Sequence, residues 1–171
     1  MNYKIAGIDV HEKMLAVVVA DVASEGEYDF ERRQFGASPD ELRQLAYWLI
    51  EQQVQEVVME STAQYWRPVW HVLERYGKAA CRGWEGAGPM SGSLLLAHAP
   101  SNRGPRGRKK DCLDAERLIK RLVAQELVLS FVPDSEQRLW RTVVRRKYQL
   151  TCHRVRWQNQ LESLLEEAHV K

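Results

Sequence analysis

The sequence predicts a mixed α/β fold, in which a five-stranded sheet with flanking helices is followed by one long C-terminal helix. Three observations predict it. Short Val- and Ile-rich segments recur within the first 60 residues, apolar residues recur at helical spacing between residues 65 and 122, and a heptad pattern occupies residues 135–169. A length of 171 residues allows one compact domain plus an extension, which we expect over residues 1–130 and 131–171.

Three strands are expected to open the chain as a meander. Tyr3–Asp9 is short and apolar, and residues 14–21 contain an unbroken Ala-Val-Val-Val run that is typical of a buried strand. The polar residues 10–13 between them suit a hairpin. Residues 27–35 alternate aromatic with charged side chains, which favours a strand at the edge of the sheet.

A helix and a fourth strand are predicted next. Ser38 and Pro39, followed by two acidic residues, form an N-cap and first turn, and leucines then recur at helical spacing. Residues 55–59 read as a strand that ends at Glu60.

The middle of the chain combines a helix with a long irregular segment. Apolar residues at helical spacing predict a helix over residues 65–76 that ends at Gly77. Glycines and prolines over residues 82–107 predict loops around a short buried strand at residues 94–97. A loop region of this length in a compact domain is more often functional than idle.

Two further helices are expected after residue 110. The first carries an apolar face of Ala115, Leu118, Ile119 and Leu122. The second runs over residues 135–169, and an apolar residue recurs at every seventh position, which predicts a coiled coil and hence a homodimer or higher oligomer. The alternative is a helix that packs on its own domain. The predicted dimer interface consists of Val143, Leu150, Trp157 and Leu164.

Charge is distributed unevenly along the chain. Residues 1–60 hold 5 basic and 12 acidic side chains, so the remaining residues hold 20 of the 25 basic and 11 of the 23 acidic ones. A basic second part favours a polyanionic partner such as nucleic acid, although basic side chains also keep a surface solvated. The candidate phosphate contacts lie before residue 111 and on the last helix: Arg103, Arg106, Arg108, Lys109, Lys110, Arg145, Arg146 and Lys147.

Cysteine usage and hydropathy favour a cytoplasmic protein. The three cysteines lie far apart and form no CxxC pair, so neither a disulfide framework nor a zinc module is indicated. The N-terminus lacks the apolar run of a secretory signal, and no stretch approaches the length of a transmembrane helix.

Four carboxylates occupy positions where chemistry could use them. Asp9 ends the first predicted strand and Glu60 the fourth, while Asp111 and Asp114 open a helix and share one of its faces. If the first and fourth strands are neighbours, these acids meet. Carboxylates held so close repel one another unless cations neutralise them, and Mg²⁺ is the expected ion for phosphodiester chemistry, with Mn²⁺ as a substitute. Taken singly, each acid also suits an ordinary role as a turn residue, a solvated strand end or a helix cap.

Three motifs resemble one protein family. The segment Gly107 to Ala115, which reads GRKKDCLDA, together with the GIDVH of residues 7–11 and the MEST of residues 59–62, resembles the DEDD transposases of bacterial insertion sequences, family one hundred and ten. The resemblance extends over essentially the whole chain. The GRKxDxxDA element is the specific one.

The resemblance implies a ribonuclease-H-like (RuvC-like) domain whose catalytic and metal-binding acids are Asp9, Glu60, Asp111 and Asp114. It implies a bacterial, magnesium-dependent recombinase that cleaves and exchanges DNA strands, works with a structured guide RNA that bridges two DNAs, and assembles through a coiled coil. Family members continue into a second domain with a nucleophilic serine, so we expect this chain to act as an amino-terminal part. Two alternatives are a non-catalytic module that binds nucleic acid and dimerises, and a self-sufficient RuvC-like junction nuclease.

Overall fold

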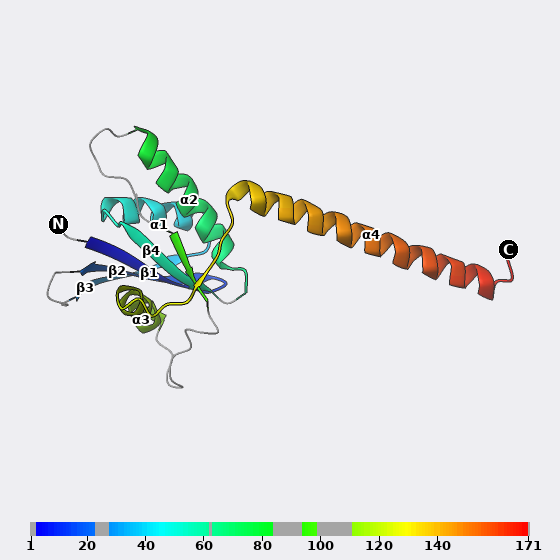
Figure 1. Ribbon diagram of the computed structural model, residues 1–171, viewed down its shortest axis with the longest axis horizontal. Coiled ribbons are helices and arrows are strands. Elements are labelled where there is room, and N and C mark those ends of the chain that lie inside the picture. The colour runs from blue at the N-terminus through cyan, green and yellow to red at the C-terminus, as the bar shows by residue number, and fades with distance from the viewer. Residues whose placement is uncertain (1–2, 23–27, 62, 84–93, 99–110, 171) are drawn as a thin grey trace. The chain divides into compact units, whose positions relative to one another are not determined.

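The computed structural model describes residues 3–22, 28–61, 63–83, 94–98 and 111–170. The chain divides into two compact units, residues 1–131 and 132–171. In the described part, the first unit is a six-stranded sheet with helices on both faces, and the second unit is one long helix with its flanking residues (Figure 1). The predicted mixed α/β architecture is therefore confirmed.

Three strands form the predicted meander. β1 (Tyr3–Val10) pairs antiparallel with β2 (Met14–Val22), and β2 pairs antiparallel with β3 (Tyr28–Gly36). β1 and β2 are buried along most of their length, whereas β3 exposes its charged residues at the outer position of the sheet. The position of β3 explains its alternation of aromatic and charged side chains.

The other half of the sheet is largely parallel. β4 (Glu56–Ser61) runs parallel to β1, and β5 (Leu94–Ala97) runs parallel to β4. β6 (Leu129–Ser130) pairs antiparallel with β5, which gives the order β3-β2-β1-β4-β5-β6. The sequence predicts five strands and misses β6, because two residues are too short to show an alternating pattern.

Two helices cover one face of the sheet (Figure 1). α1 (Pro39–Glu51) begins as predicted, since the Ser38 side chain accepts a hydrogen bond from the backbone N–H of Glu41 at 3.3 Å. α2 (Trp66–Gly83) continues past Gly77, so the predicted end at that glycine is wrong. A glycine inside a helix costs only about 1 kcal/mol relative to alanine, and the Lys, Ala and Arg residues that follow are good helix formers.

α3 (Asp111–Val123) covers the opposite face of the sheet (Figure 1). Its buried residues Ala115 and Ile119 pack in one cluster with Ile5 of β1 and with Val18 and Ala20 of β2. Contact with β1 is very close. A Cβ added to Gly7 would lie 2.4 Å from the backbone oxygen of Ala115, so this crossing requires glycine.

The second unit consists mainly of α4 (Ser135–Glu167), which is capped by the side chain of Asp134. Its 33 residues extend over about 50 Å at 1.5 Å per residue. Among the described residues of α4 none is buried, and the four predicted interface residues are all at least half exposed. The coiled-coil pairing of this helix stays a prediction.

No helix in the described part of the chain combines the length and the apolar character that crossing a bilayer would need.

Candidate metal and nucleic-acid site

Asp9 is a buried carboxylate near the end of β1. Side chains on a strand alternate between the two faces of the sheet, so Asp9 shares a face with Ile5 and Gly7, both of which lie against α3. Asp9 is only 8% exposed, in a sheet whose other buried strand residues are apolar. A carboxylate buried to this extent requires hydrogen bonds or a cation.

Glu60 lies directly beside Asp9. β1 and β4 are parallel neighbours, and Asp9 and Glu60 are Cα partners in their register. Two residues earlier on β4, Val58 packs with Leu118 of α3, so Val58 and Glu60 face the same side of the sheet as Asp9. Glu60 is partly buried. The structure thus places the predicted acids of the first and fourth strands next to each other, on one face.

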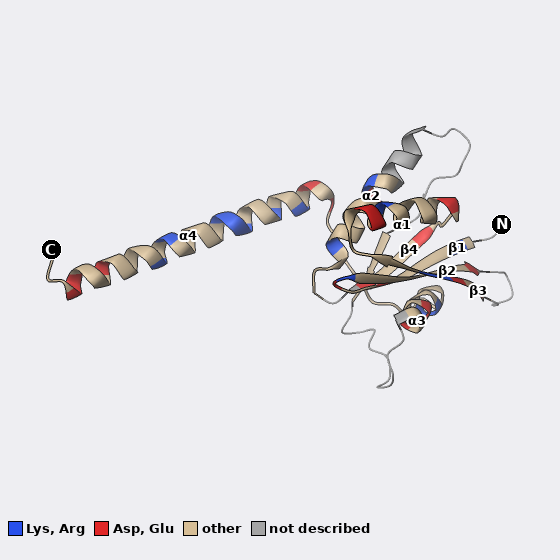
Figure 2. Cartoon of the chain, turned by 180° about the vertical axis from the view of Figure 1, so that it is seen from behind, with Lys and Arg blue, Asp and Glu red and all other residues tan. Residues whose placement is uncertain are grey.

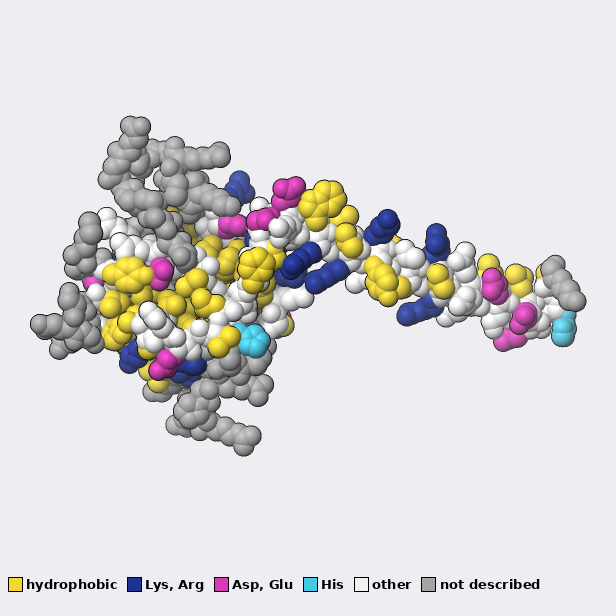
Figure 3. Space-filling model, in the orientation of Figure 1, with side chains coloured by type: hydrophobic (Ala, Val, Ile, Leu, Met, Phe, Trp, Pro, Cys, Tyr) yellow, Lys and Arg dark blue, Asp and Glu magenta, His cyan; other side chains and the backbone are white. Residues whose placement is uncertain are grey.

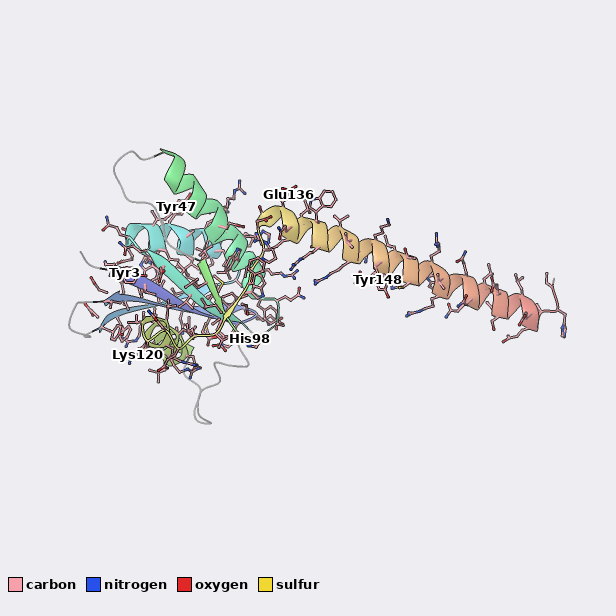
Figure 4. The ribbon with its side chains drawn as sticks, viewed as in Figure 1. Tyr3, Tyr47, His98, Lys120, Glu136 and Tyr148 are labelled. Atoms are coloured by element: carbon pink, nitrogen blue, oxygen red, sulfur yellow. The ribbon has the colours of Figure 1, made fainter. Side chains whose placement is uncertain are left out.

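Two contacts with β3 fix the direction of α3. Arg32 donates a hydrogen bond from Nε to Oε1 of Glu116 at 2.6 Å, and Lys120 lies over the ring of Phe30 at 5.5 Å (Figure 4 labels Lys120). Through the strand register, Arg32 is in line with Gly7 and Phe30 is in line with Ile5. Going forward along α3, from Glu116 to Lys120, therefore means going backward along β1, from Gly7 to Ile5. The first turn of α3 consequently lies at the edge of the sheet where β1 and β4 end.

This direction brings Asp114 toward Glu60. Asp114 precedes Leu118 by one turn on the same side of α3, and Glu60 follows Val58 by one repeat of β4. Because Leu118 and Val58 belong to one core cluster, Asp114 and Glu60 both lie on the same side of that cluster, toward the end of β4.

Asp111 and the basic segment before it are only partly described. α3 begins at Asp111, but the Asp111 side chain is outside the described part of the chain. The candidate phosphate contacts Arg103, Arg106, Arg108, Lys109 and Lys110 also lie outside it. Within the described residues, no three His, Cys, Asp or Glu side chains are grouped closely enough to bind one metal ion.

The sequence leaves two roles open for His11, which follows Asp9 by two residues: it assists the site or it only completes the turn, and the turn is favoured. Its backbone N–H does donate to the Met14 carbonyl at 3.0 Å in the β1–β2 turn. Its ring also contacts the site, since Nε2 lies 3.1 Å from Oδ2 of Asp9. Two residues on the same side of an extended segment can meet in this way, and that i, i+2 spacing was the available signal.

Asp114 forms an ion pair on its own helix. Nη1 of Arg117 lies 2.7 Å from Oδ1 of Asp114, and the two side chains are 32% and 19% exposed. Nε of Arg117 is buried and has no hydrogen-bond partner among the described atoms. The candidate site therefore carries a cation of its own beside one of its acids.

The donor chemistry of these residues fits a hard divalent cation. Asp9, Glu60 and Asp114 offer only carboxylate oxygens, which Mg²⁺ and Mn²⁺ prefer. Asp9 and Glu60 share a register position at the carboxyl ends of two parallel strands, where open α/β sheets place their ligands.

On α4, basic and apolar side chains alternate along an exposed helix. Arg145, Arg146 and Lys147 are exposed, and Figure 2 shows Lys and Arg along the middle of α4 with acidic residues toward both its ends. Apolar side chains lie between them over the length of the helix (Figure 3). A shallow groove in this helix surface is lined by Thr142, Val143, Arg146, Lys147, Leu150, Thr151 and Arg154.

Comparison with known proteins identifies the family. The sequence matches the family model of DEDD transposases of the IS110 type, described as Transposase, over residues 6–170. The chain belongs to this family. All four acids of the candidate site fall within the matched residues of this transposase family member, as do the basic residues before α3 and those on α4. No curated protein matches the chain in sequence.

Several solved structures are similar to this transposase family member at a distance. A structure of Thermus thermophilus RuvC has a TM-score of 0.48 and 11% identity, and it covers 74% of this chain and 99% of its own. T. thermophilus RuvC in complex with Holliday junction substrate has a TM-score of 0.48 and 9% identity, with 75% and 99% covered. The yeast mitochondrial Holliday junction resolvase Ydc2 has a TM-score of 0.35 and 14% identity, with 55% and 52% covered. Scores this low carry no conclusion about activity.

Proposed function

We propose that the first unit is the metal-dependent catalytic domain of a transposase that cleaves and exchanges DNA strands. Its metal ligands in this proposal are Asp9, Glu60, Asp111 and Asp114. The observation that carries the proposal is the register of β1 and β4, which sets Asp9 beside Glu60 on the face that α3 covers. Membership of the transposase family supports the choice of DNA as the substrate.

Each side chain has a distinct part in this proposal. Asp9, held in place by the ring of His11, and Glu60 supply oxygen ligands from the rigid sheet, and the first turn of α3 supplies Asp111 and Asp114. Divalent ions bound there would stabilise the charge that develops on the phosphodiester and lower the pKa of an attacking water. The close approach of Gly7 to Ala115 supports the proposal, because it would fix the distance between the acids of the sheet and those of the helix.

Nucleic-acid binding in the proposal involves both units. Arg145, Arg146 and Lys147 on α4 and the basic residues before α3 would contact phosphates of DNA and of a structured guide RNA. Support for these contacts comes from the exposure of the α4 cations and from a helix segment, residues 138–156, with seven basic and no acidic residues. Support for the guide RNA comes from family membership alone.

Self-association through α4 is the remaining part of the proposal. No described residue of the helix is buried, and Val143, Leu150, Trp157 and Leu164 form an apolar seam at a spacing of seven. A 33-residue helix with no buried residue gains stability by covering such a seam. A second copy of the chain supplies the same seam.

Titration calorimetry with Mn²⁺ tests the metal site directly. We expect Asp9→Asn and Glu60→Gln to weaken Mn²⁺ binding by at least about tenfold, since even the loss of an outer partner commonly costs that much. Both variants preserve shape, and Asn at position 9 can still accept a hydrogen bond from His11. Glu31→Gln, which removes an exposed acid from β3, is the matched control and should bind as the wild type does.

Cleavage of branched DNA separates the proposal from its alternatives. If the chain binds such DNA but Mn²⁺ binding is identical in wild type and Asp9→Asn, the acids are structural and the chain is a binding module. If it cleaves the DNA with Mg²⁺ as an isolated chain, and Glu60→Gln does not, it is a self-sufficient nuclease.

A further inference from the structure

The ion pair between Asp114 and Arg117 differs from an ordinary pair on a helix surface. Both residues lie on α3, one turn apart, with Nη1 and Oδ1 separated by 2.7 Å. The pair of Asp40 and Arg43 on α1 has the same i, i+3 spacing, which makes it a natural comparison.

The two pairs differ in exposure. Asp40 and Arg43 are 76% and 52% exposed, so water and salt screen their attraction. Asp114 and Arg117 are 19% and 32% exposed, and screening of their attraction is correspondingly weaker. The positive charge of Arg117 therefore acts strongly on whatever else binds Asp114.

Arg117 also keeps an unused hydrogen-bond donor. Its Nε is buried and has no partner among the described atoms, so Asp114 satisfies only part of the guanidinium. A buried unsatisfied donor is costly, and a guanidinium in this state gains by contact with a second acceptor.

We propose that Arg117 is the resident counter-cation of Asp114 and that it competes with the divalent ion for this acid. The inference rests on the proposed function, in which Asp114 is a metal ligand. A guanidinium at 2.7 Å occupies one carboxylate oxygen and repels an incoming dication, and both effects lower the affinity of the metal.

The competition would couple the affinity for the metal to the affinity for nucleic acid. A nucleic-acid phosphate is an anion that can take over the guanidinium, including its unused Nε donor. Once Arg117 turns to a phosphate, Asp114 is released to the metal. Metal and nucleic acid would then each raise the affinity of the other by the same factor, as linkage requires.

Mn²⁺ calorimetry on the full chain, without nucleic acid, tests the competition. We expect Arg117→Gln to tighten Mn²⁺ binding by about threefold to fivefold, the factor that an ion pair at the strong end of the measured range supports. Arg117→Lys keeps the charge and should stay near the wild type. Arg43→Gln breaks the exposed pair on α1 and should leave Mn²⁺ affinity unchanged.

The outcomes distinguish this inference from the proposed function. If Arg117→Gln binds Mn²⁺ as the wild type does, or more weakly, while Asp9→Asn still weakens binding by at least about tenfold, Arg117 does not compete and only the inference fails. If the wild type binds no Mn²⁺, both fail. Should Arg117→Gln not fold, the Nε–H resonance of Arg117 in wild type gives the answer, because Mg²⁺ should shift it and an unshifted signal overturns the competition.

Discussion

Gly7 of β1 lies so close to Ala115 of α3 that only glycine fits at position 7. A Cβ on Gly7 would lie 2.4 Å from the Ala115 carbonyl oxygen and 2.9 Å from Cγ1 of Ile119. Gly7 precedes Asp9 by two residues, and Ala115 follows Asp114 directly. The contact that holds the helix on the sheet is thus adjacent to acids on both elements, and it sets how closely they approach.

We predict that Gly7→Ala destabilises the first unit and weakens the metal site. The new methyl group meets backbone, which cannot move aside as a side chain can, and such overpacking typically costs about 1–3 kcal/mol. Thermal unfolding measures the loss. Gly36→Ala is the control, because its Cβ would meet only the flexible Glu41 side chain, at 3.3 Å, and a larger loss there than at position 7 would contradict the prediction.

A second prediction concerns the ion pair that fixes α3 against β3. Glu116 is a buried acid that is only 7% exposed. Arg32 donates a hydrogen bond to its carboxylate, and this bond is the main reason why the pKa of Arg32 is raised. Arg32→Ala leaves that carboxylate buried without its partner, so the melting temperature should fall. Adding Glu116→Gln removes the charge and should recover part of the loss. Equal melting temperatures for the single and double variants would show that the pair contributes little.

The elements that the sequence predicts well are those whose signals are local. The hairpin of β1 and β2, the charged edge strand β3 and the Ser38 cap follow from alternation and capping, which neighbouring residues decide. The end of α2 and the strand β6 do not. Gly77 stops a helix only when nothing favours continuation, and Leu129–Ser130 becomes a strand only because β5 is there to pair with it.

The candidate site shows the same division. The position of Asp9 and Glu60 at two strand ends is visible in the sequence, and the parallel register of β1 and β4 then makes them neighbours. The i, i+2 spacing of His11 and Asp9 is visible in the sequence and allows their contact. The guanidinium of Arg117 on Asp114 depends on side-chain rotamers and on burial, which periodicity does not encode. The requirement for glycine at position 7 depends on a helix more than 100 residues later in the chain.

A third prediction addresses nucleic-acid binding by α4. Arg145 and Arg146 are exposed, and each phosphate contact contributes about 0.9 to the slope of log K against log salt. Replacing both by Gln should weaken binding to duplex DNA or structured RNA and reduce that slope by up to about 1.8, if both contact phosphates. Titration at several salt concentrations measures it, with Arg43→Gln as control. An unchanged slope would exclude these side chains as contacts.

Self-association through the apolar seam gives a fourth prediction. Trp157 is 69% exposed, and a charge in its place should abolish pairing because it would be buried against the other copy. Sedimentation should therefore show a smaller particle for Trp157→Glu than for the wild type. Tyr148, labelled in Figure 4, lies nine residues earlier and so on the opposite side of the helix, and Tyr148→Glu should leave the mass unchanged. The same mass in all three proteins would mean that the seam does not pair.

The seam also predicts the orientation of the pair. Lys147 and Arg154 interrupt the apolar residues in the heptad, and in a parallel pair each would meet its own copy and repel it. In an antiparallel pair centred near residue 152, Lys147 instead faces Trp157 of the second copy, which allows a cation–π contact, and Arg154 faces Leu150. The centre of α4 is residue 151, so this alignment overlaps almost the entire helix.

Cross-linking decides between the two orientations. In a background without the native cysteines, Thr151→Cys should be joined to its own copy by a short thiol-reactive cross-linker, because antiparallel helices bring residues flanking the centre together. Leu150→Cys is the complementary variant, since a seam residue meets its own copy in a parallel pair. We expect fast cross-linking at position 151 and slow cross-linking at position 150. Faster cross-linking at position 150 than at position 151 would show that the pair is parallel. Lys147 and Arg154 would then each face their own copy, and added salt would screen this repulsion.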